Sequence, residues 1–234
     1  MWLWALIPVS FGFFGMVGIW TVCAVAVKNG AVNLTRGIPL ISTCAAYPPQ
    51  TSIFSQTFNV VAVLALMTVA IRYKQIQDYG CHGKVNVASV VVGSLAPIGL
   101  SVTSNFEASV FYIPHFIGGL VAFVCILTYN WIQVYLTYRA LVYKGRVWVV
   151  PVRLFCCIIS TIMLAGVAFL TSCHQKAFCE WIFVMLAFLL FGLFATEFRH
   201  IERCYLTVQM PTLKEECCMP APVHINHHAL HMPC

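Results

Sequence analysis

Residues 2–27 read WLWALIPVSFGFFGMVGIWTVCAVAV, an apolar stretch without a charged side chain before Lys28. About 20 apolar residues in a helix are enough to cross the hydrocarbon core of a bilayer. The stretch has no basic segment before it and exceeds the apolar core of a signal peptide, which favours a retained first membrane helix.

Five further apolar runs follow, at about 54–71, 85–105, 112–135, 148–171 and 180–198. The 234 residues are 61% hydrophobic and only 9% charged, far less charged than a soluble domain. The runs lack the two-residue alternation of barrel strands, so helices are favoured. We therefore predict an all-α membrane protein: a six-transmembrane-helix bundle over residues 1–205, followed by a disordered cytosolic tail over residues 206–234.

The basic residues predict the orientation of this bundle. Nine Lys or Arg residues fall in the connectors and tail on one side, and three fall on the other. Because basic residues favour the cytosolic side, we expect both termini in the cytosol. The nine are Arg72, Lys74, Lys84, Arg139, Lys144, Arg146, Arg199, Arg203 and Lys214, and the three are Lys28, Arg36 and Lys176. They are scattered singly, so the net charge of +6 does not indicate a nucleic-acid partner.

The stretch GIPLISTCAAYPPQTSIFSQTFN, residues 37–59, starts in the loop that follows the first run and continues into the second run. Its Tyr47-Pro48-Pro49 segment is stiff and extended, because proline fixes φ and biases the residue before it. The serines of the loop have no His, Asp or Glu beside them in the loop, which disfavours nucleophilic catalysis there. We interpret Tyr47, Pro48 and Pro49 as a candidate docking loop.

The same stretch resembles the first loop of the DRAM/Sfk (damage-regulated autophagy modulator) family of six-span proteins. The resemblance extends over about residues 1–205 and best fits the transmembrane-protein-150 branch. Four other segments carry it: GIWTVCAVAV (18–27), RYKQIQDYG (72–80), SVTSNFE (101–107) and FCEWIFVMLAFLLFGLFA (178–195).

The resemblance implies a non-enzymatic multi-pass modulator of macroautophagy without a cofactor. Such a protein raises autophagosome formation and flux and influences cell survival under stress. It resides in the cell membrane and in endosomal, lysosomal and autophagosomal membranes, with membrane lipids and membrane or cytosolic proteins as partners. Two alternatives known among relatives stay open: a channel or channel subunit for a mechanically activated cation current, and a plasma-membrane adaptor for a phosphoinositide kinase.

The side opposite the cytosol carries the predicted modification sites. Asn33 heads an Asn-Leu-Thr sequon and is a glycosylation candidate. Cys44, Cys173 and Cys179 lie in what is expected to be an oxidising compartment. Proximity in the chain favours a Cys173–Cys179 disulfide, and pairing of either with Cys44 stays open. Members of the branch commonly carry a second loop cysteine where this chain has Ser52, so Cys44 has no partner in its own loop.

On the cytosolic side, Cys204, Cys217 and Cys218 are candidates for S-palmitoylation, because they follow the last span closely. The last residues, CCMPAPVHINHHALHMPC over 217–234, hold four histidines. Three prolines and the lack of a paired CxxC disfavour a metal site, and we expect none.

Polar side chains inside the predicted spans are sparse. Asn59, Asn130 and Gln133 form no acid–base chain of the kind that a proton-coupled transporter needs. Asn105, Glu107, His115 and Glu180 fall at helix ends, where interfacial capping is the favoured interpretation. Glycines such as Gly118 favour close packing of helices within one chain, and a homo-oligomeric interface is the alternative role for them.

Overall fold

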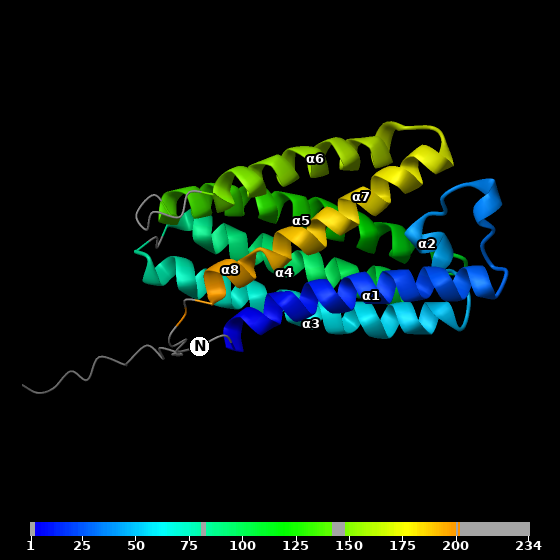
Figure 1. Cartoon of the computed structure of the whole chain (residues 1–234), viewed down its shortest axis with the longest axis horizontal. Helices are drawn as coiled ribbons and strands as arrows, with labels where there is room; N and C mark the ends of the chain where they lie inside the picture. The colour runs from blue at the N-terminus through cyan, green and yellow to red at the C-terminus, as the bar shows by residue number, and fades with distance from the viewer. Residues whose placement is uncertain (1–2, 81–82, 142–147, 200, 202–234) are drawn as a thin grey trace, which may run out of the picture. The chain divides into compact units, whose positions relative to one another are not determined.

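The computed structural model describes residues 3–80, 83–141, 148–199 and 201, and over these residues it is all-helical (Figure 1). Six helices are long and apolar enough to cross a membrane, as the sequence predicts. These are α1 (Leu6–Lys28), α3 (Gln50–Asp78), α4 (Lys84–Asn105), α5 (Tyr112–Leu141), α6 (Val149–Phe169) and α7 (Cys173–Gly192). A 3₁₀ turn, η1 (Leu3–Ala5), precedes α1, and α8 (Phe194–Phe198) prolongs α7 after Leu193. The tail predicted over 206–234 lies outside the described residues.

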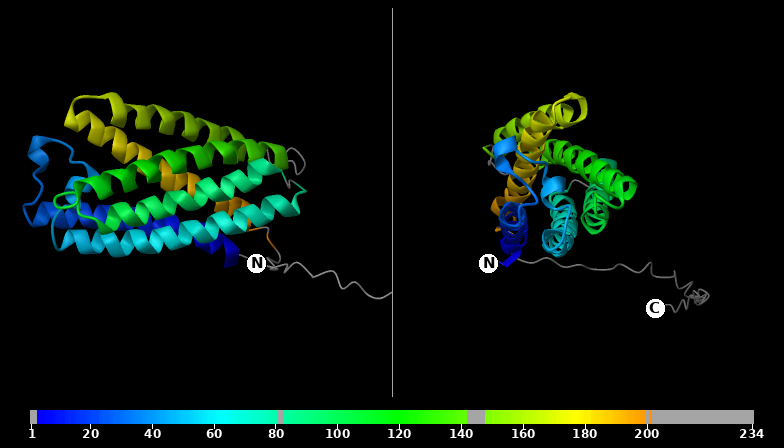
Figure 2. Two further views of the ribbon diagram at one scale, coloured as in Figure 1. Left: turned by 180° about the vertical axis from the view of Figure 1, so that it is seen from behind. Right: turned by 90° about the vertical axis from the view of Figure 1, so that its right-hand side faces the viewer.

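The six long helices pack as a closed ring in chain order. Each packs on the next, α1 on α3 through α6 on α7, and α7 returns to contact α1. The end-on view in Figure 2 shows α1 and α3 side by side, with α7 next to α1 and α6 beyond α7. Neighbours along the chain are antiparallel, so residues 29–49, between α1 and α3, lie at one end, here called the cap end (Figure 1).

Three helices extend several residues beyond their apolar runs, among them α5, which ends at Leu141 where the run ends at about 135. The helix predicted over 54–71 is α3, which begins at Gln50 and ends at Asp78, because polar residues at both ends continue the helical backbone. The helix predicted over 180–198 begins earlier, at Cys173. Hydropathy reports how much of a helix lies in hydrocarbon, and the interfacial turns fall outside that signal.

Two glycines let α4 and α5 approach closely. A Cβ on Gly99 would lie 2.7 Å from the Ala122 nitrogen and the Gly118 oxygen, and one on Gly118 would lie 2.7 Å from the Thr103 nitrogen. These are backbone atoms, which cannot rotate away as a side chain can. Small residues at such a crossing let helices pack tightly in a membrane, so Gly118 has the intramolecular role that the sequence predicts.

Aromatic side chains fill the centre of the ring. Phe11 stacks on Phe191 with ring centroids 4.7 Å apart, and Tyr129 lies 5.6 Å from Phe191. Phe194 and Phe198 continue the series towards the end opposite the cap, with stacked rings 5.9 Å apart. All five side chains are buried. This aromatic core ends at a group of charged residues.

Candidate functional site

Three charged side chains meet inside the bundle, near the end opposite the cap. Arg72 of α3 and Arg153 of α6 are almost completely buried, and so is Glu197 of α8. We call these three residues the charge cluster. Ionisable residues buried in a membrane bundle are costly and mark functional sites by default, so this cluster is the principal candidate site.

One carboxylate is shared between the two guanidinium groups. Arg72 Nη2 lies 3.2 Å from Glu197 Oε1, and Arg153 Nη2 donates to Glu197 Oε2 at 3.1 Å. Two positive charges therefore face one negative charge, and the cluster carries one excess positive charge. Removing one partner of such an arrangement leaves a buried charge without compensation, which is strongly destabilising.

Neutral polar groups from α3 and α5 surround Arg72. Its Nε donates to Gln133 Oε1 at 3.0 Å, and its Nη1 donates to Gln75 Oε1 at 2.6 Å. The Thr137 hydroxyl accepts from Arg72 Nη2 at 2.9 Å and from Arg153 Nη1 at 2.5 Å. The network therefore ties four helices, α3, α5, α6 and α8, at one level of the bundle.

The ring of Phe194 supports both cations. The guanidinium carbons of Arg153 and Arg72 lie 4.3 and 5.4 Å from its centroid. A cation near an aromatic face is stabilised most where water is excluded, as it is here. Some buried polar atoms still lack a hydrogen-bond partner, among them Arg153 Nε, Gln133 Nε2 and Tyr129 Oη. The cluster is thus held by charge and packing, without full hydrogen-bond satisfaction.

The charge cluster corrects one sequence interpretation. The sequence places Arg72 in a connector, but it lies within α3 and is buried in the bundle, so it does not report topology. The sequence pattern also does not reveal the ion pairs of Glu197 with two arginines, which form no acid–base chain because arginine does not release its proton. A signal was present: Arg153 lies just inside an apolar run and needs an acid, and Glu197 is the acid at the end of another.

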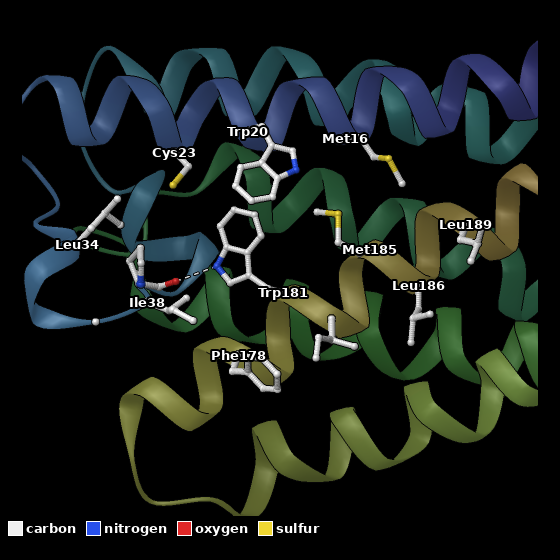
Figure 3. Close-up of a pocket in the computed structure, with 13 residues that line it drawn as sticks. Met16, Trp20, Cys23, Leu34, Ile38, Phe178, Trp181, Met185, Leu186 and Leu189 are labelled. Carbon is white, nitrogen blue, oxygen red and sulfur yellow. Dashed lines mark hydrogen bonds between the residues drawn. The ribbon is translucent and has the colours of Figure 1, made fainter.

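Residues 29–49 at the cap end, called the cap from here on, are held in place by α7. The Glu180 carboxylate accepts the Ile41 backbone N–H at 3.0 Å and so caps α2 (Ile41–Cys44), a short helix within residues 29–49. The Trp181 indole N–H donates to the Pro39 carbonyl at 2.9 Å (Figure 3). Gly37 has φ +114°, and a Cβ there would collide with the His174 ring. The sequence predicts Glu180 at the end of its own helix, but α7 begins at Cys173, and Glu180 accepts from the first turn of a loop helix instead.

The candidate docking loop is accessible. Tyr47, Pro48 and Pro49 are exposed, and they form a turn with a cis Pro48-Pro49 peptide before α3, so the predicted extended conformation is wrong. Asn33 is also exposed, and its Oδ1 accepts from the Thr35 backbone N–H at 3.0 Å and from the Thr35 hydroxyl at 2.8 Å. Docking at Tyr47-Pro48-Pro49 and glycosylation of Asn33 stay predictions.

The three cap-end cysteines differ in environment. Cys173 is exposed, Cys179 is buried, and Cys44 is buried near Cys23 of α1. Burial, with Cys23 and Glu180 nearby, raises the pKa of the Cys44 thiol well above its ordinary value. All three are free thiols in the structure, and their pairing stays a prediction. Cys204, Cys217 and Cys218 lie outside the described residues.

A second polar network joins α3 to α4 near the cap. Asn59 and Asn105 exchange amide hydrogen bonds of 3.0 and 3.1 Å, Ser55 donates to Asn105 at 2.6 Å, and Ser101 donates to Asn59 at 2.8 Å. Because each amide is paired locally, this network is suited to fixing the helix crossing.

Comparison with known proteins identifies relatives over nearly the whole chain. Residues 3–201 match the model of the Frag1/DRAM/Sfk1/Cwh43P N-terminal domain family. "Modulator of macroautophagy TMEM150B" of Danio rerio is 45% identical over 217 residues, 92% of this chain and 94% of that protein. Its Homo sapiens namesake is 37% identical over 88% of this chain and 90% of its own length. "Transmembrane protein 150A" of Mus musculus is 29% identical over 92% of this chain and 91% of that protein. No solved structure matches the chain.

Proposed function

The chain belongs to the Frag1/DRAM/Sfk1/Cwh43P family, and we propose that it is a multi-pass membrane modulator of macroautophagy. The observation that carries this proposal is the 45% identity, over 92% of the chain, to a relative named as a modulator of macroautophagy. In its finer form, the proposal is that the protein raises autophagosome formation and flux and thereby influences survival under stress. The relatives are named as modulators, so we propose a role without catalysis.

We propose that the protein acts in the cell membrane and in endosomal, lysosomal and autophagosomal membranes. The end with the charge cluster faces the cytosol, together with both termini. With Arg72 removed from the connectors, eight basic residues still lie on that side against three on the cap side. The cap then faces the lumen or the cell exterior.

Tyr47-Pro48-Pro49 is the part of the cap proposed to contact partners. It is exposed, while the rest of the cap is held to α7 by Glu180 and Trp181. A surface segment on a fixed base keeps its shape for recognition, which reduces the entropy lost on binding. The partners proposed for this segment are membrane lipids and membrane proteins, and the cytosolic proteins of the proposal would contact the connectors at the opposite end.

The test is autophagic flux in cells that express the protein, measured with and without lysosomal inhibition. Wild type should raise autophagosome number and flux. A variant with Tyr47, Pro48 and Pro49 changed to Ala should reach the same membranes but raise flux less. Val110→Ala is the matched control, because Val110 is an exposed residue of another connector.

Three outcomes are informative. An unchanged flux with wild type contradicts the function itself. Equal activity of the loop variant and Val110→Ala contradicts only the docking role of the cap. Loss of activity after deletion of residues 206–234, with the loop variant active, points to the kinase-adaptor alternative.

A further inference from the structure

A groove of about 780 Å³ opens on the outside of the bundle, between α1 and α7 and beneath the cap (Figure 3). Its volume lies within the range of small-molecule sites, about 300–1,000 Å³. The residues that decide its character are Met16, Trp20, Phe178, Trp181, Met185 and Leu189.

The groove suits a hydrocarbon occupant. Its side chains are aliphatic, aromatic or sulfur-containing, and Cys23 contributes a thiol. The Trp181 indole N–H already donates to the Pro39 carbonyl, which forms part of the lining. A sterol hydroxyl placed in such a groove would lose its hydrogen bonds to water, and that loss is costly. An acyl chain has no polar group that needs a partner.

The length and position of the groove match one leaflet. Phe178 and Leu189 mark its ends on α7, and at 1.5 Å per residue they lie about 16 Å apart. The hydrocarbon core of a bilayer is about 30 Å thick, so the groove spans about half of it. Leu34 and Ile38 of the cap line its outer part.

The groove is open to the lipid. Trp20 is 58% exposed, and Phe178 and Leu189 are about half exposed. In a bundle whose long helices span a membrane, the molecules that reach this face are lipids. We propose that the groove holds one acyl chain of a phospholipid from the leaflet on the cap side. This proposal does not depend on the role in macroautophagy.

The shape of the groove would determine which lipid chain it retains. Apolar surfaces gain no hydrophobic free energy from each other in lipid, so van der Waals contact decides which chain stays. Trp20 and Trp181, with ring centroids 4.9 Å apart, form a rigid wall. Met16 and Met185 have flexible side chains that adapt to the occupant.

The first experiment counts lipids that stay bound. The full chain is purified in mild detergent from bilayers of phosphatidylcholine and cholesterol, and native mass spectrometry measures bound lipid. Wild type should retain one phospholipid per chain. Leu189→Phe combined with Met185→Phe, which fills the groove, should lower occupancy about tenfold. Leu120→Phe, on the exposed side of α5, is the matched control and should retain the phospholipid.

The second experiment detects lipid in the groove directly, by quenching of tryptophan fluorescence, and it changes no residue that lines the groove. A variant that keeps only Trp20 and Trp181, with Phe at Trp2, Trp4, Trp131 and Trp148, is placed in bilayers with a small fraction of brominated lipid. Brominated acyl chains should quench the two tryptophans more than their mole fraction in the bilayer predicts. Brominated sterol should quench no more than its mole fraction predicts.

The proposal is overturned if wild type retains no phospholipid, or if the groove-filled variant retains as much as Leu120→Phe. Retention of sterol in place of phospholipid, or excess quenching by sterol alone, also overturns it. If the groove-filled variant does not fold, the quenching experiment decides alone.

Discussion

Arg72 and Glu197 meet in the interior of the bundle although one belongs to α3 and the other to α8, with Arg72 Nη2 3.2 Å from Glu197 Oε1. Gln75, one turn after Arg72, donates to the Glu197 backbone carbonyl at 3.1 Å. Helix α3 therefore holds both the side chain and the backbone of Glu197, which fixes α8 against the bundle.

Replacing Glu197 with Gln should destabilise the protein strongly, because two buried arginines then lack a counter-charge. Breaking a buried pair in this way costs about 3–5 kcal/mol. The control is Asp78→Asn, which breaks the exposed Lys74–Asp78 pair of 3.4 Å and should cost under about 1 kcal/mol. Equilibrium unfolding in mixed micelles measures both, and equal losses would argue against the importance of the cluster.

Removing one arginine should lower the free energy of unfolding less than removing the Glu197 carboxylate. Arg153→Met leaves Arg72 and Glu197 as a neutral pair, whereas Glu197→Gln leaves two uncompensated cations. Arg72→Met should be worse than Arg153→Met, because it also removes hydrogen bonds to Gln75 and Gln133. The same unfolding assay ranks the three variants. A larger loss for Arg153→Met than for Glu197→Gln would mean that packing on Phe194 outweighs charge balance.

Alanine at Gly99 or Gly118 should force α4 and α5 apart, because the new methyl group meets backbone atoms of the facing helix. Overpacking of this kind costs about 1–3 kcal/mol. Gly192→Ala is the control: a Cβ there meets nothing within 4 Å, so stability should change little. Thermal unfolding of the purified variants tests this. Equal behaviour at Gly118 and Gly192 would contradict the tight crossing.

Cysteine labelling should distinguish both environment and sidedness. On intact cells, an impermeant maleimide should label Cys173, which is exposed, in a variant that keeps it as the single cysteine. Cys44 should react only after denaturation, because burial shields its thiol and raises its pKa, leaving little thiolate. For protein present at the cell surface, labelling of Cys173 only after permeabilisation would reverse the proposed orientation.

In the wild-type chain the same reagent tests the predicted disulfide. If Cys173 pairs with Cys179 or Cys44, its labelling should require prior reduction. Labelling without a reductant would mean that Cys173 remains a free thiol.

Six spans could be predicted from the sequence because each is a local property: about 20 apolar residues without alternation. The α3 extension to Asp78 could not be predicted from hydropathy, because residues 72–78 are mostly polar although helical. The hydropathy boundary therefore places Arg72 in a connector. The role of Gly118 was predictable in kind, but its close approach to Gly99 depends on how α4 and α5 cross.

The charge cluster shows where local patterns stop being informative. Arg72, Arg153 and Glu197 each stand near the end of an apolar run, where a charge is ordinarily solvated by water and headgroups. Only the closed packing of the ring brings them together and excludes water. The groove is not predictable from local patterns for a similar reason, because it combines residues from α1, α7 and the cap.

The run of residues from Cys173 to Phe198 has anchors at both of its ends. Glu180 and Trp181 hold the cap at one end, and Glu197 holds the two arginines at the other. At 1.5 Å per residue the helical rise between Glu180 and Glu197 is about 25 Å, most of the thickness of the hydrocarbon core. This segment therefore couples the two faces of the membrane mechanically. A shift along its axis at one end strains the anchoring contacts at the other end.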